Sequence, residues 1–372
     1  MTTVYDGKPS IILDHRPFFS IVVPCYNSGK FIDRLLTSII NQNMNDDLEV
    51  ILADDHSTEN YDYIVDKYRD KFPIKQILTD YNFAPGNTRE KGASIAVGEW
   101  LTFIDHDDVF IDDALPKVKK AILEKGEPYY CITNFYEMFE DGRILRALKG
   151  PSGWTHGKFY NVDNLWKRFN VHYKKDLKSH EDIYLCSQIN CIMNNLNREP
   201  CRFDDIWSYV WFIVPTSLTR STYVKNAKGK TFLEYLFADY IRSTADVYFE
   251  YYDRQIISRE YAFQSVIDVM VFSYFYIESF IFRDPEGFIR ENLDIARNLL
   301  VRIKTIFNVR NKDIYHYLSR NDAGQYMAVF NTALIATGGF IPEKTLMEFL
   351  DYLHTDISYI NSKETASTNI LR

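Results

Sequence analysis

The chain has 372 residues, of which 46% are hydrophobic and 25% charged, a balance that is typical of folded globular proteins and excludes a disordered or fibrous chain. Its 43 basic and 51 acidic residues give a net charge of -8, which argues against a strongly basic nucleic-acid-binding protein. The five cysteines include no C-x-x-C pair, so we expect neither a disulfide framework nor a zinc site.

Short β-rich runs alternate with helical patterns over the first 110 residues, which predicts an α/β fold with a mainly parallel sheet. Helical spacing of apolar residues from Phe31 to Ile40 predicts the first helix. The other predicted elements in this part are strands at 18–24, 48–53, 74–78 and 100–104 and helices at 61–70 and 87–97.

The remainder of the chain predicts a mixed segment followed by a helical region. We expect strands at 130–134 and 207–212, and a change to aromatic-rich helical patterns after about residue 230. The predicted domains are therefore 1–225 and 226–372. The most apolar run, 266–282, contains two acidic residues and falls short of the roughly 20 apolar residues that a membrane span needs. With no signal peptide visible, we expect a cytoplasmic protein.

Polar clusters follow three of the predicted strands, at 25–28, 54–57 and 105–108. Ligands of open α/β sheets bind at the carboxyl ends of the strands. The three clusters therefore predict one binding site at that edge of the sheet.

Two carboxylates, Asp105 and Asp107, are separated by one residue directly after an apolar strand. Alternate side chains of a strand point to the same side, so these carboxylates can converge on Mg²⁺ or Mn²⁺ shared with a ligand's phosphates. The alternative is a solvated acidic turn.

Each of the other polar motifs has a structural alternative. Asp54 and Asp55 can accept hydrogen bonds from a base or ribose, or Asp55 or Ser57 can cap a helix. The run Ser179-His-Glu-Asp182 is either a capping box, with Ser179 as N-cap, or a carboxylate held near a helix N-terminus as a general base.

Two basic residues also lie in these predicted site segments. Arg89 can pair with a phosphate or with an acidic neighbour. Lys158 lies in an aromatic loop bracketed by glycines, 153–160, which serves either as a sugar-stacking lid or as a plain surface loop.

Taken in order, these motifs resemble the family 2 glycosyltransferases with the GT-A fold over roughly residues 18 to 222. The segments that match are Phe19-Ser-Ile-Val-Val-Pro-Cys-Tyr-Asn27, Ala53-Asp-Asp-His-Ser-Thr58, Arg89-Glu-Lys-Gly92, Phe103-Ile-Asp-His-Asp-Asp108, His156-Gly-Lys-Phe-Tyr160, His180-Glu-Asp182 and Ser217-Leu-Thr219.

The resemblance implies an inverting transferase that moves a sugar from a UDP-sugar to an acceptor hydroxyl with the help of Mn²⁺ or Mg²⁺. It implies that Asp107 binds the metal and that Asp182 is the general base. The implied donor-binding residues are Pro24 and Tyr26 lining the nucleotide pocket, Asp54 at the uracil, Arg89, Asp105 nearer the ribose, His106, and Lys158.

The resemblance leaves the acceptor open. A surface polysaccharide, a teichoic-acid-like polymer or another glycan is expected, and a hydroxylated DNA base is the less common alternative. A nucleotidyltransferase and a non-catalytic nucleotide-sugar-binding module are the rival functions. The helical region 226–372 resembles nothing that can be named and is expected to bind the acceptor or to form a homo-oligomer.

The sequence departs from the family pattern at three places. Pro85-Gly86-Asn87 replaces the family's small-residue run before Arg89. His56 replaces the glycine of the family's Asp-Asp-Gly-Ser run. The segment around Trp211 lacks the family's tail arginine, and Lys158 or Arg220 is the candidate replacement for its contact with phosphate.

Overall fold

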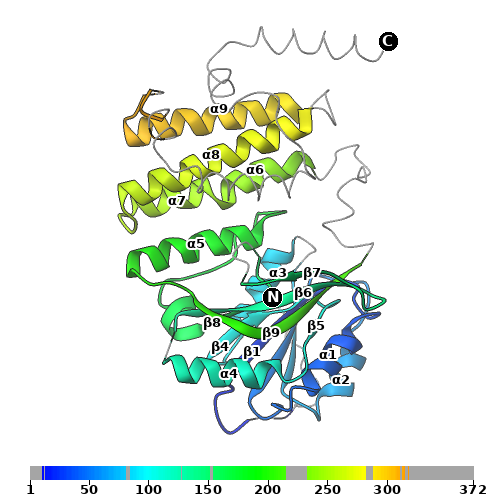
Figure 1. Ribbon diagram of the computed structural model, residues 1–372. Helices are drawn as coiled ribbons and strands as arrows, with labels where there is room; N and C mark the ends of the chain where they lie inside the picture. Colours follow the sequence, from blue (N-terminus) through cyan, green and yellow to red (C-terminus); the bar gives the residue numbers. More distant parts are fainter. Residues whose placement is uncertain are drawn as a thin grey trace, which may run out of the picture. The chain divides into compact units, whose positions relative to one another are not determined.

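The structure is a computed structural model, and it describes residues 11, 13–80, 84–126, 128–150, 154–214, 233–281, 288–310, 312–314 and 317 (Figure 1). Contacts between Cα atoms divide the chain into two compact units, 1–225 and 226–372. The sequence motifs described above all lie in the first unit. The Ser217-Leu-Thr219 motif, Arg220 and the predicted boundary at 225 fall outside the described residues.

Four parallel strands form the first half of the sheet, in the spatial order β3-β2-β1-β4. Their bounds are β1 Phe19–Cys25, β2 Leu48–Asp54, β3 Ile74–Leu78 and β4 Trp100–Phe103. Every residue of β1 and β2 is buried, as expected for strands with both faces covered. The four strands predicted from the sequence are confirmed to within one residue at each end.

The second half of the sheet is mostly antiparallel and continues in the order β4-β8-β6-β9-β5, with β7 paired to β6. The bounds are β5 Val109–Phe110, β6 Tyr130–Phe139, β7 Ile144–Leu148, β8 Lys158–Asn161 and β9 Cys201–Ile213. The strands predicted at 130–134 and 207–212 exist but are longer than expected. Their length comes from a parallel pairing of β6 with β9, a long-range contact that leaves no local pattern.

Helices cover both faces of this sheet. They are α1 Ile32–Ile40, α2 Asp62–Tyr68, α3 Pro85–Ser94, α4 Ala114–Lys125 and α5 Glu181–Leu196, with a π-helical turn at Val162–Lys167. In Figure 1, α1, α2 and α4 lie on the opposite side of the sheet from α3 and α5. The alternation within β1 fits this arrangement: Phe19, Ile21 and Val23 belong to the core cluster that includes residues of α1, α2 and α4, whereas Val22 faces α3.

The predicted helix 87–97 is displaced by two or three residues, since α3 starts at Pro85 and ends at Ser94. Proline is favoured at the first position of a helix, where its missing N–H costs nothing. Gly86 and Gly92 let α3 approach its neighbours closely. A Cβ at Gly86 would lie 2.8 Å from Cβ of Glu181, and one at Gly92 would lie 2.4 Å from Cγ1 of Val22.

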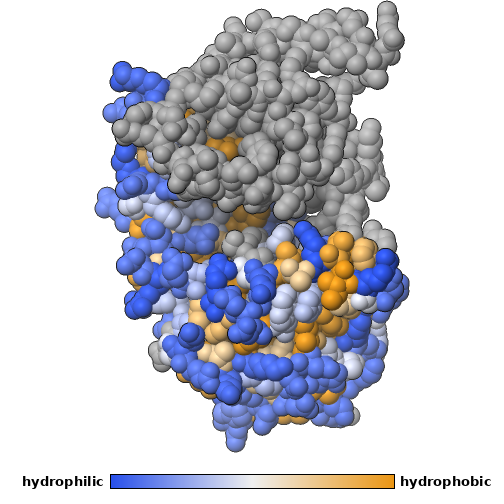
Figure 2. Space-filling model, in the orientation of Figure 1, coloured by the Kyte–Doolittle hydropathy of each residue, from blue (hydrophilic) through white to orange (hydrophobic). Residues whose placement is uncertain are grey.

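The described part of the second unit is helical, as expected. Its helices are α6 Leu233–Ser243, α7 Ala245–Asp253, α8 Arg259–Ile281 and α9 Phe288–Phe307. Among the described residues, no helix combines the length and apolar composition that crossing a membrane requires. Figure 2 shows that the visible surface of the first unit is mainly hydrophilic, with hydrophobic residues gathered in limited patches.

Candidate active site

The three predicted polar clusters lie at the ends of neighbouring strands, because β1 pairs with both β2 and β4. Cys25 at the end of β1 is opposite Asp54 at the end of β2. The imidazole of His106, in the loop after β4, donates from Nδ1 to the carbonyl of Pro24 (3.1 Å). The structure therefore brings the three clusters to one edge of the sheet.

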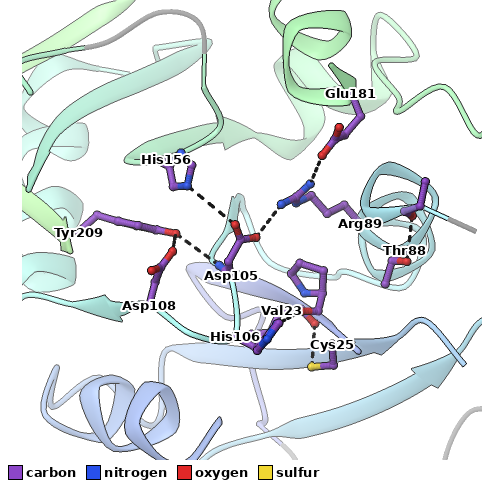
Figure 3. A network of polar contacts seen from close by, with 12 residues as sticks. Val23, Cys25, Thr88, Arg89, Asp105, His106, Asp108, His156, Glu181 and Tyr209 are labelled. Carbon is purple, nitrogen blue, oxygen red and sulfur yellow. Dashed lines mark hydrogen bonds and ion pairs between the residues drawn. The ribbon is translucent and has the colours of Figure 1, made fainter. Parts of the chain in front are cut away.

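A buried arginine joins two parts of this edge (Figure 3). Arg89 of α3 donates from Nη2 to Oδ1 of Asp105 (2.6 Å) and from Nη1 to Oε1 of Glu181 (2.8 Å). Burial alone would lower the pKa of Arg89, but the carboxylates of Asp105 and Glu181 raise it well above the usual value. Burial would raise the pKa of the Asp105 carboxyl group, but Arg89, together with His156 and His106, lowers it. Of the two partners considered for Arg89, the structure shows the acidic neighbours.

Asp182 lies in the first turn of α5, next to Glu181. Burial and, to a smaller extent, the charge of Glu181 raise its pKa to about 7, against the opposite effects of Arg89 and Lys158. A carboxyl group with this pKa is suited to take up a proton near neutral pH. The arrangement gives Asp182 the environment of a general base.

The capping-box alternative for this segment is wrong. The helix begins at Glu181, two residues after Ser179, and no side-chain hydrogen bond caps it. His180 occupies the cap position with a left-handed backbone, φ 57°. Because of that conformation the chain turns sharply into α5, and the first turn of the helix carries both acids.

A third group adjoins Asp105. His156 places Nε2 3.8 Å from Oδ2 of Asp105, and its ring stacks on Trp211 with a centroid separation of 5.1 Å. Neither ring nitrogen has a hydrogen-bond partner among the described residues. Burial lowers the pKa of His156 to about 4, so the imidazole is neutral at neutral pH and offers a lone pair. Sequence reasoning did not select His156, although it begins a segment quoted for the resemblance.

The ligand atoms of Asp105, Asp108 and His156 lie within 4.8 Å of one another, which makes them a candidate metal group. Both oxygens of Asp108 already accept hydrogen bonds, from the hydroxyl of Tyr209 (2.5 Å) and the N–H of Phe212 (2.8 Å). Burial raises the pKa of Asp108 well above its usual value. Asp108 therefore holds β9 against the loop.

Asp107, the predicted metal ligand, lies in the same loop but outside that group. Its carbonyl accepts a hydrogen bond from Arg34 of α1, whose guanidinium also lies 4.0 Å from the ring centroid of Phe212. Burial raises the pKa of the Asp107 carboxyl group, and the charge of Asp105 raises it further. Arg34 thus fixes the backbone of the acidic loop, a role that sequence reasoning missed.

The residues predicted to bind the nucleotide lie at the ends of β1 and β2. Pro24 and Asp54 are buried, whereas the side chain of Tyr26 is exposed (48%). Asp54 accepts the N–H of Ser57 at Oδ1 (3.0 Å), and Asp55 accepts the hydroxyl of Thr79 (3.2 Å). The alternative that Asp55 or Ser57 caps a helix is wrong, because α2 begins only at Asp62.

Lys158 is not in a surface loop. It begins β8, is 2% exposed, and donates from Nζ to Sγ of Cys186 in α5 (3.1 Å). The alternatives of a lid and of a plain surface loop are both wrong for this residue, since antiparallel pairing with β6 draws it into the sheet. The positive charge of Lys158 lowers the pKa of the Asp182 carboxyl group in α5.

Residues 20–193 match the family model described as Glycosyl transferase family 2. Poly(ribitol-phosphate) beta-N-acetylglucosaminyltransferase TarS of Staphylococcus aureus strain MW2 is 38% identical over 183 residues, which is 44% of this chain and 31% of TarS. Poly(ribitol-phosphate) beta-glucosyltransferase of Bacillus spizizenii is 37% identical over 99 residues, which is 26% of this chain and 16% of that protein. The chain thus spans about a third or less of these relatives.

The fold is also shared with a solved structure. S. aureus TarS 1–349 in complex with UDP-GlcNAc aligns with a TM-score of 0.60 at 21% identity, covering 77% of this chain and 83% of that one. At this identity the likeness concerns the fold, and it confirms the GT-A architecture that the motifs predicted.

Proposed function

We propose that this chain, whose residues 20–193 match the model described as Glycosyl transferase family 2, transfers a sugar from a UDP-sugar to an acceptor hydroxyl with inversion at C1. The observation that supports this most strongly is the link Asp105–Arg89–Glu181. It holds the acidic loop after β4 and the N-terminal turn of α5 together, so that a donor site and a base belong to one site.

The nucleotide of the donor binds at the ends of β1 and β2 in this proposal. Asp54 accepts a hydrogen bond from the base, and Pro24 and the exposed ring of Tyr26 line the pocket. The UDP and UDP-GlcNAc complexes of TarS support UDP as the nucleotide. Arg89, Asp105 and His106 lie between the nucleotide and α5 and so adjoin the diphosphate and ribose.

A divalent cation fits the acidic loop. The unpartnered nitrogens of neutral His156 beside Oδ2 of Asp105 are an N and O donor set, and Asp107 adds a second carboxylate from the same loop. We assign Asp105, Asp107 and His156 as the residues that hold Mn²⁺ or Mg²⁺. A cation held there would neutralise the charge that develops on the leaving diphosphate.

Asp182 takes the proton from the acceptor hydroxyl. As that oxygen forms its bond to C1, the bond between C1 and the diphosphate oxygen breaks and UDP leaves. A single displacement of this kind inverts the configuration at C1. The pKa of about 7 means that Asp182 is largely ionised slightly above neutral pH and can accept the proton.

The proposed acceptor is a hydroxyl of an alditol-phosphate polymer of the teichoic-acid type. Two relatives are named as transferases acting on poly(ribitol-phosphate), which supports this choice over other glycans. The net charge of -8 weighs against DNA as the acceptor.

Nucleotide release tests the proposal directly. The protein is incubated with UDP-, GDP-, CDP- and dTDP-sugars, with Mn²⁺ or with EDTA, and with or without poly(ribitol-phosphate). We expect UDP release from one UDP-sugar that requires the metal and is stimulated by the polymer. Pyrophosphate release would instead indicate a nucleotidyltransferase, and the absence of both release and metal-dependent donor binding would indicate a non-catalytic binding module.

A further inference from the structure

Two cysteines face each other in the sheet at a distance from the site described above. Cys131 near the start of β6 is the register partner of Cys201, the first residue of β9. Neighbouring strands are about 4.8 Å apart, which lies within the range of Cα separations, roughly 4.4–6.8 Å, that a disulfide spans. Both residues are free thiols.

The two cysteines have unequal environments. Cys131 is fully buried, whereas Cys201 is only partly buried. The neighbouring thiol of Cys131 lowers the pKa of Cys201 to about 7, and the charge of Lys125 contributes in the same direction against the effect of burial. Cys201 is only partly buried, so a small molecule can reach it.

Two of the other thiols differ from Cys201. Burial raises the pKa of both Cys25 and Cys186, and both residues are buried. The thiolate is the nucleophile in thiol chemistry, and a thiol whose pKa is near the ambient pH attacks most effectively. Cys201 therefore has the properties of an attacking thiol, with Cys131 placed beside it to resolve the product.

We propose that Cys131 and Cys201 form a reversible disulfide when the protein meets a small-molecule disulfide. The thiolate of Cys201 attacks one sulfur of the oxidant, and the first small thiolate leaves. Cys131 then loses its proton and attacks the sulfur of Cys201, and the second small thiolate leaves. Two protein thiols are oxidised, and one small disulfide is reduced to two thiols.

The bond would act on stability rather than on the chemistry of transfer. Cys201 is separated from Tyr209, the site residue of β9, by about 25 Å of extended strand. The loop closed by the bond, residues 131–201, includes His156, Glu181 and Asp182. Cross-linking its ends restricts the unfolded chain in just the segment that supplies these residues.

Peptide mapping after oxidation tests the proposal. The native protein is treated with oxidised glutathione at pH 7.5, remaining thiols are blocked with N-ethylmaleimide in denaturant, and peptides are analysed without reduction. We expect a loss of 2 Da, a linked pair of peptides containing Cys131 and Cys201, and recovery of both thiols with dithiothreitol. We also expect a higher thermal unfolding midpoint in the oxidised protein.

Three variants make the result specific. C131S should stop at a mixed disulfide of glutathione on Cys201, and C201S should not react at this pair. K125M should slow the reaction several-fold at pH 7 and regain the rate at pH 9, where Cys201 is ionised without help. The control C191S, which removes a buried thiol of α5, should form the linked peptides as the unchanged protein does.

A linked pair involving other cysteines would overturn the proposal. So would a stable glutathione adduct on Cys201 in the protein that retains Cys131, or full alkylation of both residues after oxidation.

Discussion

The side chains of the site depend on one buried cation, Arg89. It forms ion pairs with an acid of the loop after β4 and with an acid of α5, two segments about 75 residues apart in the chain. Removing one partner of a buried ion pair leaves a charge without compensation, which costs several kcal/mol. Arg89, Asp105 and Glu181 therefore act as a unit that sets the distance between the donor site and the base.

The proposed role of His156 in metal binding can be tested directly by measuring the affinity for Mn²⁺. Changing it to alanine removes the imidazole beside Oδ2 of Asp105, so we expect Mn²⁺ affinity, measured by electron paramagnetic resonance, to fall by about tenfold or more. H15A, which removes an exposed histidine, is the control and should leave the affinity unchanged. Equal Mn²⁺ affinity in H156A and the unchanged protein would remove His156 from the metal site.

The pKa of Asp182 predicts the pH dependence of turnover. A base works when ionised, so kcat should level off above pH 7 and fall about tenfold per pH unit below it. Lys158 lowers this pKa, so K158M should move the rising limb to higher pH. K167M, which changes an exposed lysine, should leave the limb in place. A limb that does not move in K158M would contradict the proposed influence of Lys158 on the base.

Single residues were predictable where a motif identifies them and not where their role depends on tertiary contacts. Asp105, Arg89 and Asp182 were predicted as site residues from short segments, and their roles stay predictions. His156, Glu181 and Arg34 were not, because each acts on a residue between 50 and 100 positions away in the chain. His56 stands where the family has glycine, and its backbone is left-handed at φ 62°. Glycine is the residue best suited to that conformation, which explains the family pattern.

Among the elements, the four parallel strands agree closely with the prediction, because the strand–helix pattern of the first 110 residues can be read from local sequence. The second half of the sheet does not, since β6 pairs with β9 along nearly its whole length and with β8 near its start and β7 near its end. Local sequence cannot specify such pairing. For this reason the length of β9 and the position of Lys158 differ from expectation.

The contact of α3 with the sheet gives a prediction on stability. An alanine at position 92 would place its Cβ 2.4 Å from Cγ1 of Val22 and 3.2 Å from Cβ of Ala53, so one element must move. We expect G92A to lower the free energy of unfolding by about 1–3 kcal/mol in urea titration. S94A, on the exposed side of the same helix, is the control and should change it by less than about 0.5 kcal/mol. If G92A is as stable as S94A, α3 does not pack as tightly as described.

For the whole molecule, the division into two compact units separates the proposed transfer chemistry from the role of the C-terminal helices. All residues assigned to donor, metal and base lie in the first unit, which also contains the part of the chain that matches the family model. The second unit contributes described helices α6 to α9, and its role in acceptor binding or in forming a homo-oligomer stays a prediction. Val301 and Ile306 of α9 are exposed apolar residues of that unit.

Sugar transfer by D182N tests the central claim most directly. General-base catalysis contributes about 10²–10⁴-fold, so single-turnover transfer from the UDP-sugar to poly(ribitol-phosphate) should be slower by that factor. The dissociation constant of the donor, measured by calorimetry with Mn²⁺, should change by less than about threefold, since the proposed mechanism has Asp182 contact the acceptor and not the nucleotide. Transfer at the unchanged rate would contradict Asp182 as the base and with it the mechanism proposed for this site.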